Sequence, residues 1–311
     1  MRLMARSEPP IFETDGLTKR YPKVTALSGL TVSAPPGVVG LVGANGAGKS
    51  TLIKILLGLV RPTSGRASVL GMDTATQGPR IRQVVGYMPE HDCLPPDVSA
   101  TEFVVHMARM SGLPYAAARE RAADTLRHVG LHEERYRAIG EYSTGMRQRV
   151  KLAQALVHDP RLVFLDEPTN GLDPRGRDEM LTLIRRIGSE FGISVLVTSH
   201  LLGELERICD HVIVIDGGRL LRSSALRDFT QATSVVAVEV EEGAQALAAR
   251  LAEAGEAVTV DGRVLAVQVS ADDPGRTFDA VRDAVCDLDL RLIRLEQRRG
   301  RIEDIFTKEV A

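Results

Sequence analysis

The chain has 311 residues, of which 26% are charged and 44% are hydrophobic, and its formal net charge at pH 7 is −2. These values are typical of a soluble globular protein with one large or two modest domains, and they exclude bulk electrostatic binding of nucleic acid. The apolar runs, such as residues 55–60, are far shorter than the roughly 18 residues of a membrane-spanning helix, and the N-terminal segment lacks the apolar core of a signal peptide.

The first part of the chain, to about Leu221, alternates predicted strands with predicted helices. Helix patterns begin at Lys49, at Asp173–Pro174 and near Leu201, and Asp173 is suited to cap the helix that follows it. Short runs rich in Val, Ile and Leu, which are typical of strands buried on both faces, cover residues 38–43, 161–167, 193–200 and 211–218. This alternation predicts an α/β domain with a parallel sheet.

A helical insert interrupts this alternation. No strand pattern occurs between Pro89 and about His158. Ser99 and Glu102 have the spacing of a capping box that opens a helix, and a second helix pattern over residues 116–131 is closed by Gly130. We therefore expect an all-helical subdomain at about residues 90–158, within an α/β domain of residues 1–225.

The pattern changes after about Leu226. Two predicted helices, at 244–254 and near 277–286, separate runs with the alternation of half-buried strands at 234–240, 257–260, 265–269 and 290–296. Asp261–Gly262 between two of these runs predicts a hairpin. The order β-α-β-β-α-β predicts a small ferredoxin-like α+β domain, residues 226–311, in which no residue suggests catalysis.

The three cysteines, Cys93, Cys209 and Cys286, are widely spaced and odd in number. Neither a disulfide framework nor a metal site has this spacing. They predict three structural thiols in a reducing compartment.

Residues 43–50 read "GANGAGKS" and fit the phosphate-loop pattern G-x-x-x-x-G-K-[ST] between a predicted strand and a predicted helix. Glycines let the backbone wrap closely around a phosphate, and the helix N-terminus favours an anion. Lys49 supplies a positive charge for the phosphates, and the hydroxyl of Ser50 is a ligand for Mg²⁺. The pattern predicts a nucleotide-binding loop.

Two carboxylates end the apolar run "LVFLDE". Asp166 and Glu167 are predicted at the carboxyl end of a parallel strand, where open α/β sheets bind ligands. Asp166 is suited to hold Mg²⁺ through water, and Glu167 is suited to act as a general base on an attacking water.

Residues 141–156 read "EYSTGMRQRVKLAQAL", with small polar residues leading directly into a helix pattern. Ser143 and Gly145 are interpreted either as a simple helix cap or as residues that contact a ligand. Local pattern alone leaves both interpretations open.

Taken together, these segments resemble the ATP-binding cassette (ABC) family over about Ile11 to Leu221. "GANGAGKS" resembles its phosphate loop, "YSTGMRQRVKLAQAL" its signature, "LVFLDEPTNGLDP" its second carboxylate motif with the D-loop, "TSH" its switch histidine and "YPKVTAL" its adenine-stacking segment. The resemblance implies that the fold is a P-loop NTPase cassette and that the activity is ATP hydrolysis with Mg²⁺.

The resemblance also implies a role for each matching residue. Tyr21 is expected to stack on adenine, Glu167 to act as base and His200 to contact the γ-phosphate. The residues expected to bind Mg²⁺ are Ser50, Glu90 and Asp166. Those expected on the phosphates are Gly43, Ala44, Asn45, Gly46, Ala47, Gly48, Lys49, Ser50 and Thr51.

Members of the family pair head to tail, which implies that Ser143 and Gly145 contact ATP held by a second cassette. We expect that cassette to be another copy of this chain, with two different cassettes as the alternative. The signature departs from the commonest form at Thr144 and Met146. Glu90 replaces the usual glutamine, and the alternative interpretation is that it is a surface acid.

The sequence "RRGRIEDIFTKEV" near the C-terminus, together with "YMPE" and "YSTGM", is similar to cassettes of bacterial drug, lipid and polysaccharide exporters of the daunorubicin-resistance type. The resemblance implies a peripheral ATPase on the cytoplasmic face of the membrane that energises export through a separate permease, with residues 96–137 as the candidate contact surface. No nucleic-acid partner is expected.

Two other functions are considered. One is a soluble ABC ATPase without a transport role, although the chain shows neither a second cassette, nor a long coiled-coil insertion, nor a basic arm. The other is a regulator that ATP switches without turnover. The transported substrate and the role of the C-terminal domain, whether regulatory, dimerising or stabilising, stay open.

Overall fold

The computed structural model describes residues 9–229, 232–269 and 274–299. The "GRIEDIFTKEV" part of the sequence used for the exporter subgroup lies outside these residues. The chain divides into two compact units, Met1–Leu226 and Arg227–Ala311. None of the described helices combines the length and the apolar composition that a membrane span requires.

A six-stranded sheet forms the centre of the first unit, in the order β10-β9-β3-β8-β7-β6. The strands β6, β7, β8, β3 and β9 run parallel, and β10 is antiparallel to β9. Every residue of β3 and β7 is buried, as expected from their apolar sequences. The bounds are β3 Val38–Val42, β6 Val85–Met88, β7 Leu162–Asp166, β8 Ser194–Ser199, β9 His211–Asp216 and β10 Arg219–Ala225.

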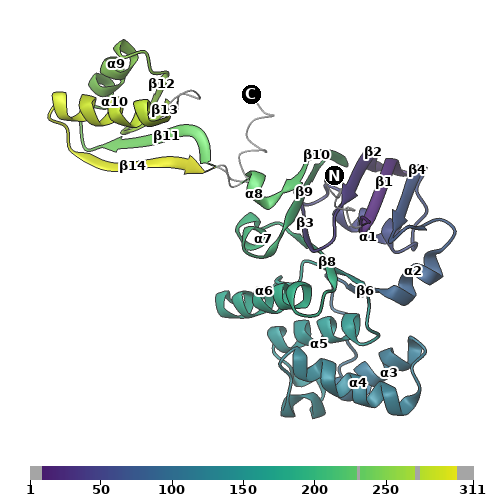
Figure 1. Ribbon diagram of the computed structural model, residues 1–311. Helices are drawn as coiled ribbons and strands as arrows, with labels where there is room; N and C mark the ends of the chain where they lie inside the picture. The colour runs from purple at the N-terminus through teal and green to yellow at the C-terminus, as the bar shows by residue number, and fades with distance from the viewer. Residues whose placement is uncertain (1–8, 230–231, 270–273, 300–311) are drawn as a thin grey trace, which may run out of the picture. The chain divides into compact units, whose positions relative to one another are not determined.

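A second sheet, antiparallel and absent from the sequence-based prediction, lies beside the first (Figure 1). Its order is β2-β1-β4-β5, with bounds β1 Phe12–Tyr21, β2 Val24–Ala34, β4 Ser64–Val69 and β5 Met72–Asp73. One core cluster joins this sheet, helix α1 (Lys49–Leu56) and the central sheet, through residues such as Phe12, Leu52 and Phe164. This shared core fixes the phosphate loop between the two sheets.

The helical subdomain contains α3 (Ala100–Met110), α4 (Tyr115–His128), two short 3₁₀ turns (η1 Glu133–Tyr136 and η2 Ile139–Glu141) and α5 (Thr144–Leu156). The predicted capping box is confirmed, since Glu102 N–H donates to Ser99 Oγ over 3.2 Å and Ser99 N–H donates to Glu102 Oε2 over 2.9 Å. In Figure 1 these helices gather away from β1 and β2.

The other helices of the first unit are α2 (Gly78–Val84), α6 (Pro174–Ser189), α7 (Leu202–Ile208) and, at the boundary, α8 (Leu226–Phe229). The predicted cap of α6 is confirmed, because Asp173 Oδ1 accepts the N–H of Gly176 over 3.0 Å. Helix α6 buries Met180, Ile184 and Ile187. It thereby anchors the loop that follows β7.

The second unit has the predicted β-α-β-β-α-β order, and its sheet is antiparallel in the order β12-β13-β11-β14. Its helices form a core with the sheet that includes Val238, Leu247 and Val281 (Figure 1). The bounds are β11 Ala232–Val240, α9 Ala244–Glu253, β12 Val258–Asp261, β13 Val264–Gln268, α10 Pro274–Asp287 and β14 Leu292–Arg299. The predicted hairpin is confirmed by the pairing of Asp261 with Val264.

The three cysteines are free thiols in different surroundings. Cys209 is buried, and burial raises the pKa of its thiol. Cys93, beside the loop of Glu90, and Cys286, in α10, are exposed. Partial desolvation of the Cys93 sulfur nevertheless raises the pKa of its thiol, and the charge of Lys151 opposes this shift.

Candidate active site

The phosphate loop connects β3 to α1 and is shaped by two glycines that no other residue replaces without strain. A Cβ on Gly43 would clash with the backbone oxygen of Ile215. Gly48 has a φ of +102°, and a Cβ there would clash with the backbone oxygen of Ala26. Gly48 is also the N-cap of α1 and provides no side-chain cap, so the first amides of the helix face the loop.

Lys49 is buried at the base of the loop. Its Nζ donates to the Gly43 carbonyl oxygen over 2.6 Å and lies 3.9 Å from Glu167 Oε1. A lysine is rarely buried without partners, and these contacts account for its position. The amine therefore lies between the phosphate loop and the end of β7.

The end of β7 is held by Thr198 of β8, a fully buried residue. Thr198 Oγ1 donates to Asp166 Oδ1 over 2.8 Å and accepts the backbone N–H of Glu167 over 2.9 Å. Glu167 has a φ of +50°, a left-handed conformation that is costly for a residue other than glycine. Thr198 thus fixes the backbone turn that directs both carboxylates.

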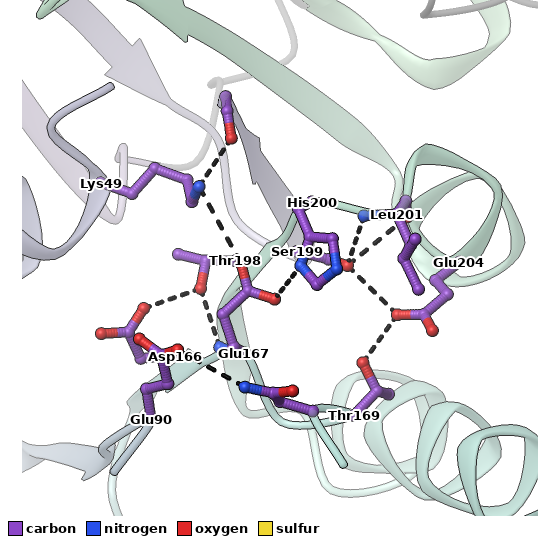
Figure 2. Close-up of polar contacts among 12 residues, drawn as sticks. Lys49, Glu90, Asp166, Glu167, Thr169, Thr198, Ser199, His200, Leu201 and Glu204 are labelled. Atoms are coloured by element: carbon purple, nitrogen blue, oxygen red, sulfur yellow. Dashed lines mark hydrogen bonds and ion pairs between the residues drawn. The ribbon is translucent and has the colours of Figure 1, made fainter. Parts of the chain in front are cut away.

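Glu167 and His200 form a direct pair. His200 Nδ1 lies 2.9 Å from Glu167 Oε2, and Figure 2 shows the Glu167 carboxylate between His200 and Lys49. The Glu167 side chain is only 8% exposed, whereas that of His200 is 51% exposed. A buried carboxylate with a histidine on one oxygen is suited to accept a proton from water at its open side.

The loop of His200 is braced by Glu204 of α7. Ser199 Oγ and Thr169 Oγ1 both donate to Glu204 Oε2, over 3.1 and 2.7 Å (Figure 2). Ser199 Oγ also accepts the N–H of Leu201 over 3.0 Å. The buried Glu204 therefore connects the segment after Glu167 with the segment that contains His200.

Most of the predicted nucleotide and Mg²⁺ residues line one cavity of about 580 Å³. Gly43 is not among the lining residues, and its carbonyl oxygen instead accepts the Lys49 amine. The lining residues are Tyr21, Val24, Ala26, Ala44, Asn45, Gly46, Ala47, Gly48, Lys49, Ser50, Thr51, Glu90, Asp166, Glu167, Asn170 and His200. The cavity is large enough for a nucleotide.

The cavity offers oxygen ligands suited to Mg²⁺, namely the hydroxyl of Ser50 and the carboxylates of Glu90 and Asp166. Burial, and then the charge of Asp166, raise the pKa of the neighbouring Tyr87 to about 12. Within the described ranges, no three His, Cys, Asp or Glu side chains cluster as metal ligands. This donor set fits Mg²⁺, which commonly keeps waters and is shared with substrate phosphates.

Ser143 and Gly145 lie apart from this cavity. They line a second cavity, also of about 580 Å³, together with Thr144, Met146, Arg149, Gly171, Leu172, Asp173, Arg175, Gly176 and Glu179. Ser143 is the N-cap of α5 and accepts the N–H of Met146 over 3.3 Å. The structure therefore divides the predicted site residues between two surfaces of one chain.

Five further residues of the site were missed by the sequence-based prediction: Gln148, Lys151, Asn170, Thr198 and Glu204. Asn170 lies within "LVFLDEPTNGLDP" and Thr198 within "TSH", so the motifs themselves indicated that both residues are near the site. Gln148, Lys151 and Glu204 each meet at least one partner that is distant in sequence, for example Glu90, 61 residues from Lys151. Their contacts have no local sequence signal.

The chain matches the family model described as "ABC transporter" over residues 27–170. It is 35% identical to the daunorubicin/doxorubicin resistance ATP-binding protein DrrA of Streptomyces peucetius, over 87% of this chain and 84% of that protein. It is 33% identical to the Nod factor export ATP-binding protein I of Ralstonia nicotianae, over 96% of this chain and 93% of that protein. It is 38% identical to the bacitracin transport ATP-binding protein BcrA of Bacillus licheniformis, over 68% of each chain.

Solved structures agree with the fold. The cbiO1 protein of Clostridium perfringens, part of the cbiONQ ABC transporter complex, aligns with a TM-score of 0.65 and 28% identity over 71% of this chain and 90% of that chain. The dimeric cassette MJ0796, in a post-hydrolysis state with ADP and Pi, aligns with a TM-score of 0.64 and 24% identity over 70% of this chain and 99% of that chain. The family and fold predicted from the motifs are thus confirmed, and the chain belongs to the ABC family as an ATP-binding, ATP-hydrolysing transporter subunit of the drug-resistance and exporter type.

Proposed function

We propose that this chain hydrolyses Mg²⁺-bound ATP in the cavity between the phosphate loop and the end of β7. The observation that carries the proposal is the buried Glu167 carboxylate, paired with His200 and 3.9 Å from the Lys49 amine. We further propose residues 1–225 as the ATP-binding domain, about 90–158 as its helical subdomain and 226–311 as an accessory domain.

In this proposal three groups of contacts hold ATP: one to the adenine and two to the phosphates. Tyr21, which is 39% exposed at the cavity wall, stacks on adenine. The backbone amides of residues 43–51 bind the phosphates, with the positive end of the α1 dipole behind them. The Lys49 amine exchanges the Gly43 carbonyl for the β- and γ-phosphate oxygens.

Ser50, Glu90 and Asp166 are the residues that would hold Mg²⁺, directly or through water. When bound, the ion offsets the negative charge of the phosphates and of the two carboxylates. Thr198 keeps Asp166 directed to this position through its 2.8 Å hydrogen bond.

Glu167 then acts as the general base. The oxygen of a water attacks the γ-phosphorus, the bond to the β–γ bridging oxygen breaks, and the proton of the water moves to the free oxygen of Glu167. His200 orients the carboxylate and contacts the γ-phosphate. The products are ADP and inorganic phosphate.

The second cavity supports pairing of two cassettes, preferably two copies of this chain. Ser143, Gly145 and the N-terminus of the 13-residue helix α5 form an anion-binding surface that its own chain leaves apart from the phosphate loop. The γ-phosphate of the paired chain is the proposed ligand. The cassette MJ0796, which is 25% identical over 70% of this chain, was solved as a dimer, and this supports pairing of cassettes.

Export through a separate membrane permease is supported by the similarity to export and resistance proteins. The chain is then peripheral on the cytoplasmic face, and residues 96–137 are the proposed contact surface. Detergent extraction of membranes tests this part of the proposal. Co-purification with a hydrophobic membrane protein supports it, and recovery of the chain without such a protein contradicts it.

The assignment of the base is tested with Glu167→Gln. Loss of the proton acceptor should lower the steady-state ATPase rate by at least about a hundredfold, while ATP affinity stays near the parent value, because general-base catalysis contributes on this scale. Glu190→Gln, at the exposed C-terminal end of α6, is the matched control and should keep the parent rate. A Glu167→Gln rate equal to that of the parent would refute the assignment.

A further inference from the structure

Helix α5 connects the two surfaces that the proposed function requires. It begins at the N-cap Ser143, and its next turns include Gln148 and Lys151. Residues three apart lie on one side of a helix. Gln148 is 6% exposed and Lys151 is 3% exposed, so this side is buried against the ATP-binding core.

Lys151 reaches the loop that contains Glu90. Its Nζ donates to the Glu90 carbonyl oxygen over 2.9 Å. Burial lowers the pKa of Lys151, and neighbouring acidic groups, including Asp92 and Glu90, oppose this shift. A buried cation costs free energy by desolvation, and its hydrogen bond to the loop compensates only part of that cost.

Gln148 reaches the loop after β7. Its Nε2 donates to the Asn170 carbonyl oxygen over 3.1 Å, and Asn170 N–H donates to the Glu167 carbonyl oxygen over 3.1 Å. The Oε1 of Gln148 is buried without a hydrogen-bond partner among the described residues. A buried amide with one unsatisfied oxygen is costly, so the residue is poorly explained by stability alone.

The contacts of Lys151 and Gln148 with these two loops are connected to each other by a contact between the loops. Asn170 Nδ2 lies 3.5 Å from Glu90 Oε1, and both residues line the nucleotide cavity. Glu90, Asn170, Gln148 and Lys151 therefore join the cavity to the helix whose N-terminus is Ser143. These hydrogen bonds give any shift of Glu90 or Asn170 a direct route to α5.

We propose that Lys151 and Gln148 are positioning residues that couple the ATP site of each chain to the signature surface that the same chain presents to its partner. This inference rests on the proposed function, in which Glu90 contacts Mg²⁺ and Ser143 contacts ATP in trans. In this link the Glu90 carbonyl oxygen accepts from Lys151, and the Glu90 carboxylate meets the Asn170 amide.

The variant Lys151→Met separates positioning from stability. Methionine fills a similar volume, and it removes the desolvation cost of the buried charge together with the hydrogen bond to the half-buried Glu90 carbonyl, so the melting temperature should stay close to that of the parent. The ATPase rate should nevertheless fall by about tenfold, the effect of losing one charge-assisted hydrogen bond. Lys151→Arg keeps a charged donor and should restore most of the rate. Lys54→Met, which removes an exposed amine, is the matched control.

Mixed dimers of full-length chains, purified through two different tags, test the coupling itself. The reference pairs a wild-type chain with Glu167→Gln, so that only one site turns over. In the first arrangement Lys151→Met is in the chain that retains Glu167. In the second, Lys151→Met and Glu167→Gln are in the same chain, so the active site lies in the wild-type chain and only its signature comes from the altered chain.

Both arrangements should turn over about tenfold more slowly than the reference, because Lys151 acts on its own Glu90 and on its own signature. A loss in only one of the two arrangements would overturn the coupling, as would no loss in either or a markedly lower melting temperature of Lys151→Met. An inactive wild-type chain would instead refute the proposed function.

Discussion

Thr198 is the residue on which the geometry of both active-site carboxylates depends. Its hydroxyl serves as a donor to Asp166 and as an acceptor for the Glu167 amide, in a fully buried position. The second bond stabilises the left-handed backbone of Glu167, a conformation that costs on the order of 1–3 kcal/mol. One small side chain thus holds the Mg²⁺ ligand and the base proposed for the site.

The variant Thr198→Val tests this dependence. Valine keeps the shape but leaves a buried amide and a carboxylate oxygen unpaired, which should lower the free energy of unfolding of the first unit by about 2 kcal/mol. The ATPase rate should fall as well, while Thr198→Ser keeps both properties near the parent values. Urea unfolding and steady-state assays measure the two effects, and a fully active, fully stable valine variant would contradict the argument.

At the scale of whole elements, the sequence predicted well what is encoded locally. The parallel strands are continuous apolar runs, and the caps at Ser99 and Asp173 follow short spacing rules. The antiparallel sheet was missed because β1 and β2 mix polar and apolar residues and pair with several register shifts, which disturb a period of two. Most of the residues that the motifs single out line one cavity, but the contacts of Lys151 and Glu204 depend on tertiary packing.

The capping box of α3 gives a prediction for one element. Ser99→Ala removes the side-chain acceptor of the box and should destabilise the first turn by about 1 kcal/mol, so its amides should exchange roughly fivefold faster. Hydrogen exchange detected by mass spectrometry measures this locally. Ser111→Ala, at the other end of the helix, should leave the exchange of the first turn unchanged. Equal exchange in parent and Ser99→Ala chains would contradict the role of the cap.

At the scale of the whole molecule, the two units have separate cores. The cluster that holds the phosphate loop is formed by buried side chains from the range 11–215. The cluster of the second unit is formed by buried side chains from the range 236–285. Each unit therefore buries its own apolar surface, which is the condition for a domain that folds independently.

A chain that ends after Phe229 should accordingly remain folded and bind ATP with parent affinity. Circular dichroism during heating and titration with a fluorescent ATP analogue measure the two properties. The full-length chain is the control. Aggregation of the shortened chain, or a loss of ATP affinity by more than about tenfold, would show that the first unit depends on the second, contrary to the usual independence of domains.

The distribution of the thiols gives the molecule a natural pair of labelling positions. Cys93 lies in the first unit and Cys286 in the second, both exposed, whereas Cys209 is buried. Maleimide dyes can therefore be attached to one position in each unit without engineered cysteines. Energy transfer between the dyes would measure whether the distance between the two units changes when ATP binds.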